Sequence, residues 1–333
     1  MISALVRALV LGSAFVSVGG LAATARGDGL PVIGVNTASQ GVVATRGGDR
    51  YIALPARRGT VVARVDREGG RVRRSAYVEG RFAVPAVAYD GSASGLSADE
   101  QTLVLIRPRA RFPQAETRLA VLSAARLRVR DFVTLPGDFS FDGISPGGSM
   151  LYLIQYTSRV DPNRYRVRAY DVRARRLLSA PIVDPRERGE AMRGSPITRA
   201  TSPDGRWAYT LYDGAGKAPF VHALDLSRHT ARCIDLDALA GRNAYNLGLG
   251  VDPGGRTLTV LADRKPVAIV DTRTFRVTEP GASPASTGKG GDPWVYLAAA
   301  VGALGLAGVS AVAVWRRRLA RLAARTEVVD AST

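Results

Sequence analysis

The chain has 333 residues, 46% of them hydrophobic, which excludes a disordered protein and leaves room for one large domain or two ordinary ones. Its formal net charge is +17, and arginine supplies nearly all of the positive charge. The single cysteine, Cys233, excludes an intramolecular disulfide bond.

The first 25 residues have the pattern of a secretory signal peptide. Arg7 gives a short positive region, Ala8–Val18 is apolar and uncharged, and Ala23-Thr24-Ala25 supplies the small residues of a cleavage site. An uncleaved N-terminal anchor is the alternative, but the apolar stretch is shorter than the ~20 residues of a comfortable membrane span. We therefore predict that the mature chain begins near Arg26.

A short turn followed by a β-favouring run recurs five times between residues 26 and 280. The starts are between 48 and 57 residues apart, and the turns are Thr45–Gly48, Ser97–Glu100, Ser145–Gly148, Ser202–Gly205 and Asp252–Gly255. Self-similarity at a period near 50 indicates one repeated supersecondary unit.

The fourth copy is the clearest. A lead-in at 195–201 is followed by apolar or aromatic runs at 206–212, 220–226 and 231–236, separated by turn residues. The other copies follow the same order, the first more weakly. Many short strands at regular spacing predict an all-β fold, and four strands per unit predict a β-propeller of about five four-stranded blades.

The run from Ser202 to Tyr209, followed by an Ala-Leu-Asp-Leu strand, resembles the repeats of TolB-like, YVTN-like and WD40-like bacterial β-propellers. The resemblance covers roughly Val32 to Pro280 and lacks the Trp-Asp and Gly-His signatures of strict WD40 repeats. Such families range from lactone hydrolases to periplasmic scaffolds, so the resemblance implies a disc able to bind, and no particular activity.

The C-terminal part has the pattern of a membrane anchor. Residues 281–293 read as a flexible Gly/Ser/Pro linker, 294–315 as a transmembrane helix with tryptophan at both ends, and 316–333 as a basic tail. A buried core helix is the alternative, which the arginine cluster directly after Trp315 disfavours. We expect a single-pass cell-membrane protein with the propeller outside and the C-terminus in the cytoplasm.

Searches for catalytic and metal-binding patterns find none that is convincing. The only histidines, His222 and His229, have no Gly-x-Ser-x-Gly elbow, and with Cys233 they lack zinc-ligand spacing. Cys233 reads as a small buried hydrophobe. The acidic candidates also fail: Asp204-Gly205 lacks the spacing of a sialidase Asp box, Asp138, Asp142 and Asp161 are too scattered for calcium, and 184–190 reads as a solvated loop. We predict no catalytic, cofactor-binding or metal-ligating residue, and no cofactor.

The net positive charge indicates which classes of partner to expect. Residues 26–293 carry +13, spread over all repeats. Outside a cell this favours a protein or an anionic cell-envelope ligand over nucleic acid, although genomic base composition is the stronger explanation of such diffuse arginine. The bilayer is a further partner, through the C-terminal helix. We expect a binding or scaffold module; the alternative is a membrane-tethered hydrolase acting on a lactone, glycan or cell-wall substrate in the propeller channel.

Overall fold

The computed structural model describes residues 41–67, 70–187 and 192–280, which belong to one compact unit. The predicted signal peptide, linker, transmembrane helix and basic tail lie outside these residues. Within the described residues, none of the helices combines the length and apolarity needed to cross a membrane.

The described chain is all-β, as predicted, with three short 3-10 segments (Gly214–Gly216, Asp237–Leu239 and Ala244–Asn246) and no α-helix among the described residues. Its strands form five successive antiparallel sheets, four with four strands and one with three. Sheet 1 contains β1 (Val42–Val43), β2 (Arg50–Ala56), β3 (Gly59–Val65) and β4 (Val72–Glu79). Sheet 2 contains β5 (Thr102–Ile106), β6 (Glu116–Ser123) and β7 (Arg128–Pro136).

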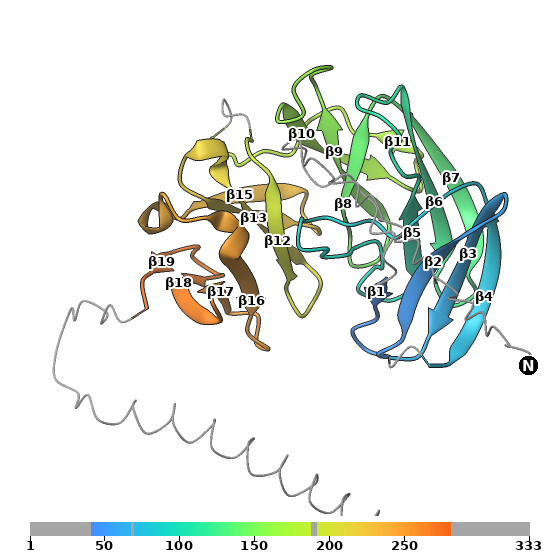
Figure 1. Cartoon of the computed structure of the whole chain (residues 1–333), viewed down its shortest axis with the longest axis horizontal. Coiled ribbons are helices and arrows are strands. Elements are labelled where there is room, and N and C mark those ends of the chain that lie inside the picture. The colour runs from blue at the N-terminus through green and yellow to red at the C-terminus, as the bar shows by residue number, and fades with distance from the viewer. Residues whose placement is uncertain (1–40, 68–69, 188–191, 281–333) are drawn as a thin grey trace, which may run out of the picture. The chain divides into compact units, whose positions relative to one another are not determined.

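Sheet 3 contains β8 (Phe139–Ile144), β9 (Met150–Tyr156), β10 (Tyr165–Asp171) and β11 (Arg176–Leu177). Sheet 4 contains β12 (Pro196–Thr201), β13 (Trp207–Tyr212), β14 (Phe220–Asp225) and β15 (Thr230–Asp235). Sheet 5 contains β16 (Leu247–Val251), β17 (Thr257–Ala262), β18 (Lys265–Asp271) and β19 (Val277–Thr278). Within each sheet, strands that are consecutive in the chain are neighbours, an arrangement that fits a β-propeller (Figure 1).

The recurring turn builds the same connection in every sheet. In the last four copies, the first turn residue (Ser97, Ser145, Ser202 or Asp252) accepts with its side chain the N–H of the residue five positions later, which begins the next strand or adjoins it. The fourth turn position always has a left-handed backbone, which glycine adopts in four copies and Glu100 (φ 60°) in the second. The turn therefore sets the backbone that starts the second strand of sheets 1, 3, 4 and 5 and the first strand, β5, of sheet 2.

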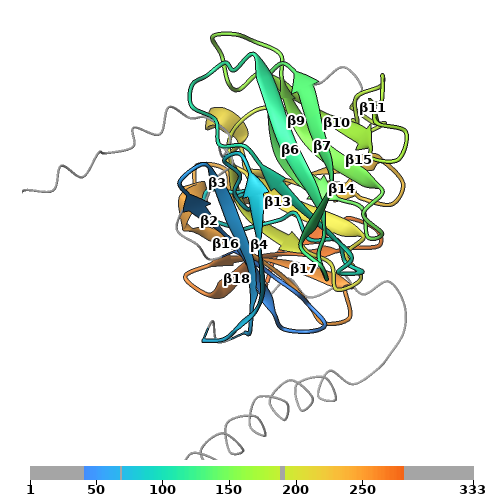
Figure 2. The same ribbon diagram turned by 90° about the vertical axis from the view of Figure 1, so that its right-hand side faces the viewer.

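Apolar side chains pack between consecutive sheets in four buried clusters, one each for sheets 1–2, 2–3, 3–4 and 4–5. A sheet between two neighbours buries both faces, which explains why all five residues of β5 are buried rather than alternating with exposed ones. Figure 2 shows the same sheets from a second side.

Sheet 2 departs from the prediction of four strands. Its first strand position is interrupted: Ala83 pairs with Ile106, and the N–H of Val104 donates to Gly95 O, but the chain between them leaves the sheet. Gly95 has a left-handed backbone (φ 109°), and a Cβ there would lie 2.5 Å from Val104 O, so only glycine allows this return.

The segment that leaves sheet 2, Pro85–Ser94, forms a small hairpin that reaches sheet 4; we call it the cross-sheet hairpin. Ala86 bridges Ala93, and the N–H groups of Tyr89 and Asp90 donate to the carbonyls of Pro196 and Ile197 on β12, at 3.0 Å each. The hairpin thus ties the first strand position of sheet 2 to the first strand of sheet 4.

Candidate functional site

A buried polar cluster lies between sheets 3 and 4. On β8 and the residue before it, Phe139 and Phe141 pack into the apolar cluster shared with sheet 2, whereas the alternate residues Asp138, Ser140 and Asp142 are buried polar groups. The strand period of two thus sorts apolar residues to one face of β8 and carboxylates to the other.

Both carboxylates are paired with arginines from other sheets. Asp138 accepts from Arg109, in the β5–β6 loop, at 2.5 Å, and the Arg109 guanidinium lies 4.7 Å from the Tyr156 ring centre. Asp142 pairs with Arg199 of β12. The four side chains are between 3% and 6% exposed, so each pair is a buried, charge-compensated contact.

The interpretation of Asp138, Asp142 and Asp161 as scattered acids needs revision for the first two. The alternation of Asp138-Phe139-Ser140-Phe141-Asp142 is the signal that places Asp138 and Asp142 on one face of a strand. Asp161 lies elsewhere, in the β9–β10 loop, where it accepts the N–H of Asn163. The structure therefore does not assemble these three carboxylates as calcium ligands.

Across sheet 4 the polar cluster continues as a row of cross-strand neighbours. The register pairs Arg199 with Thr210, Thr210 with His222, and His222 with Cys233, so one residue from each strand shares the face toward sheet 3. Arg199 Nε donates to Thr210 Oγ1 at 2.9 Å. Asp142 contacts Arg199 at one end of this row, and Asp184 contacts Cys233 at the other end.

The two histidines take different structural positions. Burial lowers the pKa of His222 to about 4, with Asp142 raising it and Arg199 lowering it further, so the imidazole is neutral at pH 7. A buried base with this pKa is a poor proton acceptor for catalysis at neutral pH. His229, in the β14–β15 turn, has its Nδ1 2.6 Å from the Tyr152 hydroxyl of sheet 3.

His229 belongs to a repeated contact between neighbouring sheets. The turn before the last strand of sheets 2 to 5 contains a left-handed non-glycine residue: Leu127, Arg175, His229 and Phe275, with φ between 53° and 60°. Each contacts the preceding sheet. Leu127 joins the apolar cluster of sheets 1–2, Arg175 pairs with Asp131, and Phe275 lies 5.3 Å from Trp207, ring centre to ring centre. We call these four residues the clamp residues.

Cys233 lies beside two carboxylates. Its Sγ and one oxygen each of Asp184 and Glu187 lie within 4.8 Å of one another, the spacing of possible metal ligands. The Asp184 carboxylate, however, already accepts from Arg186 and from the Cys233 N–H, and Arg232 Nη1 lies 3.8 Å away. Two guanidinium groups at the same carboxylate favour an ion-pair network over a cation site.

Asp184 departs from the prediction that 184–190 is a solvated loop, whereas Pro185 and Arg186 are exposed as predicted. Although burial would raise its pKa, the hydrogen bonds from Arg186 and the Cys233 N–H lower it to about 2. Asp184 is only 3% exposed, and its carboxylate accepts the Cys233 N–H at the edge of β15. Cys233 itself is half-buried, and burial followed by the charge of Glu187 raises the pKa of its thiol, which disfavours the reactive thiolate.

The repeated turn gives no ligand site at Asp204. Its carboxylate accepts the Ser202 hydroxyl and the Arg206 N–H, both within the turn. These bonds explain the Ser-Pro-Asp-Gly sequence as a turn former.

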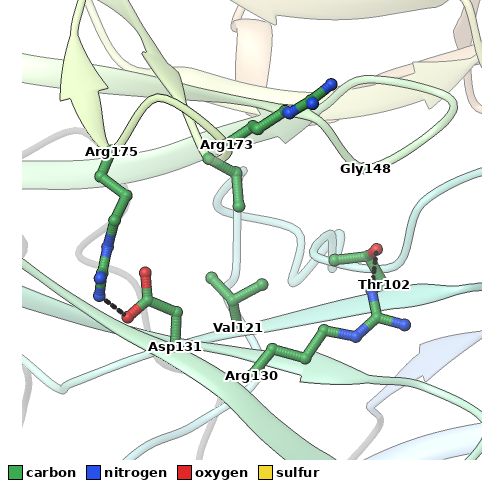
Figure 3. A pocket seen from close by; sticks show the side chains of 8 residues that line it. Thr102, Val121, Arg130, Asp131, Gly148, Arg173 and Arg175 are labelled. Atoms are coloured by element: carbon green, nitrogen blue, oxygen red, sulfur yellow. Dashed lines mark hydrogen bonds and ion pairs between the residues drawn. The ribbon is translucent and has the colours of Figure 1, made fainter.

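A groove of about 290 Å³ opens between sheets 2 and 3 (Figure 3). Arg130 and Asp131 of β7 form one wall, Arg173 and Arg175 of the β10–β11 turn form the other, and Thr102 and Gly148 close one end. Sequence reasoning did not find it, because no spacing relates Arg130 to Arg173 before the sheets pack together.

No family model and no curated protein matches this sequence. Solved structures do match at low similarity. The hydrazine synthase of Kuenenia stuttgartiensis is 12% identical with a TM-score of 0.35, over 72% of this chain and 83% of that chain. A prolyl endopeptidase is 14% identical (TM-score 0.37, 72% of this chain and 37% of that chain), and a puromycin hydrolase mutant complexed with PGG is 17% identical (TM-score 0.41, 76% and 38%). This chain thus spans well under half of both hydrolases, and similarity this low transfers no function to it.

Proposed function

We propose that this chain is a single-pass membrane protein that presents a five-bladed β-propeller outside the cell, where it acts as a binding or scaffold module. The signal-like segment 1–25, the apolar segment 294–315 and the arginines that follow it support this topology. The five consecutive antiparallel sheets support the blade count.

One observation carries the binding function: the buried groups that could do chemistry are used to hold sheets together. Asp138 and Asp142 are neutralised by arginines, His229 contacts Tyr152, and Asp184 holds the edge of β15. A catalytic acid or base needs access to a substrate, whereas these side chains are engaged in contacts with other strands and sheets. The same contacts give a rigid platform, which suits recognition by surface loops and grooves.

The topology is tested by protease treatment of intact cells that express the full chain with a C-terminal tag. We expect loss of the propeller region and survival of a short tagged fragment. Full protection of the region 26–280 in intact cells, with cleavage after lysis, would contradict an extracytoplasmic propeller.

The binding function is tested by cross-linking living cells and capturing the tagged full-length chain. The matched control carries residues 1–25 joined directly to 281–333, so it keeps the anchor and tail but lacks the propeller. We expect a partner or envelope polymer that the full chain captures and the control does not. Turnover of a lactone, glycan or wall substrate by the full chain but not by the control would instead establish the hydrolase alternative.

A further inference from the structure

The groove between sheets 2 and 3 has more positive charge than its own residues neutralise. Arg175 pairs with Asp131, the acidic residue of the lining, so this pair is satisfied internally. Arg130 makes one long contact, 3.5 Å from its Nη1 to Thr102 Oγ1, and among the described residues neither Arg130 nor Arg173 has an ion pair. Two guanidinium groups from different sheets therefore face one opening without an anion.

A second groove at the equivalent place between sheets 1 and 2 shows that this is not a general property of the repeat. Its volume is about 320 Å³, and its lining includes Arg64, Asp49 and Glu100. There Arg64 pairs with Asp49 at 2.6 Å, and Glu100 accepts the Arg46 N–H. The repeat creates both grooves, but the lining of the second one has three carboxylates, Asp49, Asp99 and Glu100, beside its two arginines, so it has no excess of positive charge.

The direction of the side chains defines a site at one end of the groove between sheets 2 and 3, which we call the arginine groove. In Figure 3, Arg175 turns toward Asp131, Arg130 extends toward Thr102, and Arg173 extends along the opposite wall, away from Arg130. The Thr102 hydroxyl accepts from Arg130 and keeps a proton to donate. Gly148 has a left-handed backbone (φ 73°), and a Cβ there would lie 2.4 Å from Thr102 Oγ1, so a side chain would close this end.

We propose that the arginine groove binds a phosphate group, held by Arg130 and the Thr102 hydroxyl at one end, with Arg173 adding positive charge from the opposite wall. Planar guanidinium groups donate paired hydrogen bonds that match phosphate oxygens, and two of them balance a dianion. The groove is at the small end of ligand pockets, which suits a single phosphate group better than a large organic ligand. This inference rests on the proposed binding function and names its ligand class.

The test uses the full-length chain in detergent and measures heat of binding for inorganic phosphate, glycerol phosphate and the dicarboxylate malonate. We expect both phosphates to bind and the Arg130→Ala/Arg173→Ala variant to bind them at least ~10-fold more weakly. The charge-matched control is Arg57→Ala/Arg58→Ala, which removes two exposed arginines from the β2–β3 turn and should bind like the parent.

Equal weakening in both variants would reduce the effect to net charge and overturn the site, as would unchanged binding in the groove variant. Malonate binding as tight as phosphate would overturn the phosphate assignment. Competition by phosphatidylglycerol vesicles assigns a lipid headgroup as the source, and competition only by a soluble glycerol phosphate polymer assigns an envelope polymer. If the cross-linked partner is still captured by the groove variant, this inference fails while the binding function stands.

Discussion

The Arg199–Asp142 pair offers the sharpest test of how sheets 3 and 4 are joined. We expect Arg199→Ala to leave the Asp142 carboxylate buried without its counter-charge. Arg199 contacts both the side chain and the backbone carbonyl of Asp142 and the hydroxyl of Thr210. Within the described residues Asp142 Oδ2 already lacks a hydrogen-bond partner, so the variant leaves both carboxylate oxygens unsatisfied.

Removing one partner of a buried ion pair costs about 3–5 kcal/mol of unfolding free energy. For a domain of this size, that loss lowers the melting temperature by roughly 10 °C. The measurement is thermal unfolding of the full-length chain in detergent, followed by circular dichroism of the β signal.

Two controls separate the buried charge from other effects. Arg107→Ala breaks an ion pair with Glu116 whose side chains are 35% and 46% exposed, and should change stability by only ~0–1 kcal/mol. Arg199→Met combined with Asp142→Asn removes both charges and should recover more than half of the loss. A melting temperature for Arg199→Ala equal to that of Arg107→Ala, or no recovery in the double variant, would refute the reasoning.

Three further predictions concern the same inter-sheet contacts. Because the pKa of His222 is about 4 in the fold and 6.5 in the unfolded chain, the unfolded state binds the proton first as the pH falls, so the parent should lose about 3 kcal/mol of unfolding free energy between pH 6.5 and 4. In His222→Leu, the free energy of unfolding measured in urea should depend less on pH over this range. The same pH dependence in parent and variant would contradict the buried neutral imidazole. Asp184, with a pKa lowered from 3.8 to about 2, stabilises the fold above pH 4, and about 2 kcal/mol of unfolding free energy should be lost as the pH falls to 2. Acid unfolding of Asp184→Asn should lack this loss, and an acid transition like that of the parent would contradict the prediction. Tyr152→Phe deletes the hydroxyl that donates to Leu226 O at 2.6 Å and contacts His229, so the urea midpoint should fall by the equivalent of about 1–3 kcal/mol. A midpoint equal to that of the parent would show that the contact at His229 does not stabilise the fold.

Much of the fold could be predicted from local pattern. The runs predicted at 206–212 and 220–226 nearly coincide with β13 and β14, because turn chemistry and β-favouring side chains act within a few residues. The cross-sheet hairpin was missed, because Pro85–Ser94 has few alternating residues and its bonds to β12 join segments about 100 residues apart.

The candidate sites depended far more on packing. Asp138 and Asp142 have a visible alternation, but nothing near them in sequence identifies Arg109 or Arg199 as partners. The clamp residues also look unrelated, since leucine, arginine, histidine and phenylalanine share only a left-handed backbone.

By itself, the sequence determined the all-β class, the period of about 50 residues and the turns that start one strand of each sheet, because these depend on local backbone preference and on side chains that alternate along a strand. Only the tertiary structure decided that the carboxylates and histidines join sheets and that Arg130 and Arg173 face one groove. Charge pairing and burial depend on which surfaces meet, and that is settled only when the sheets pack.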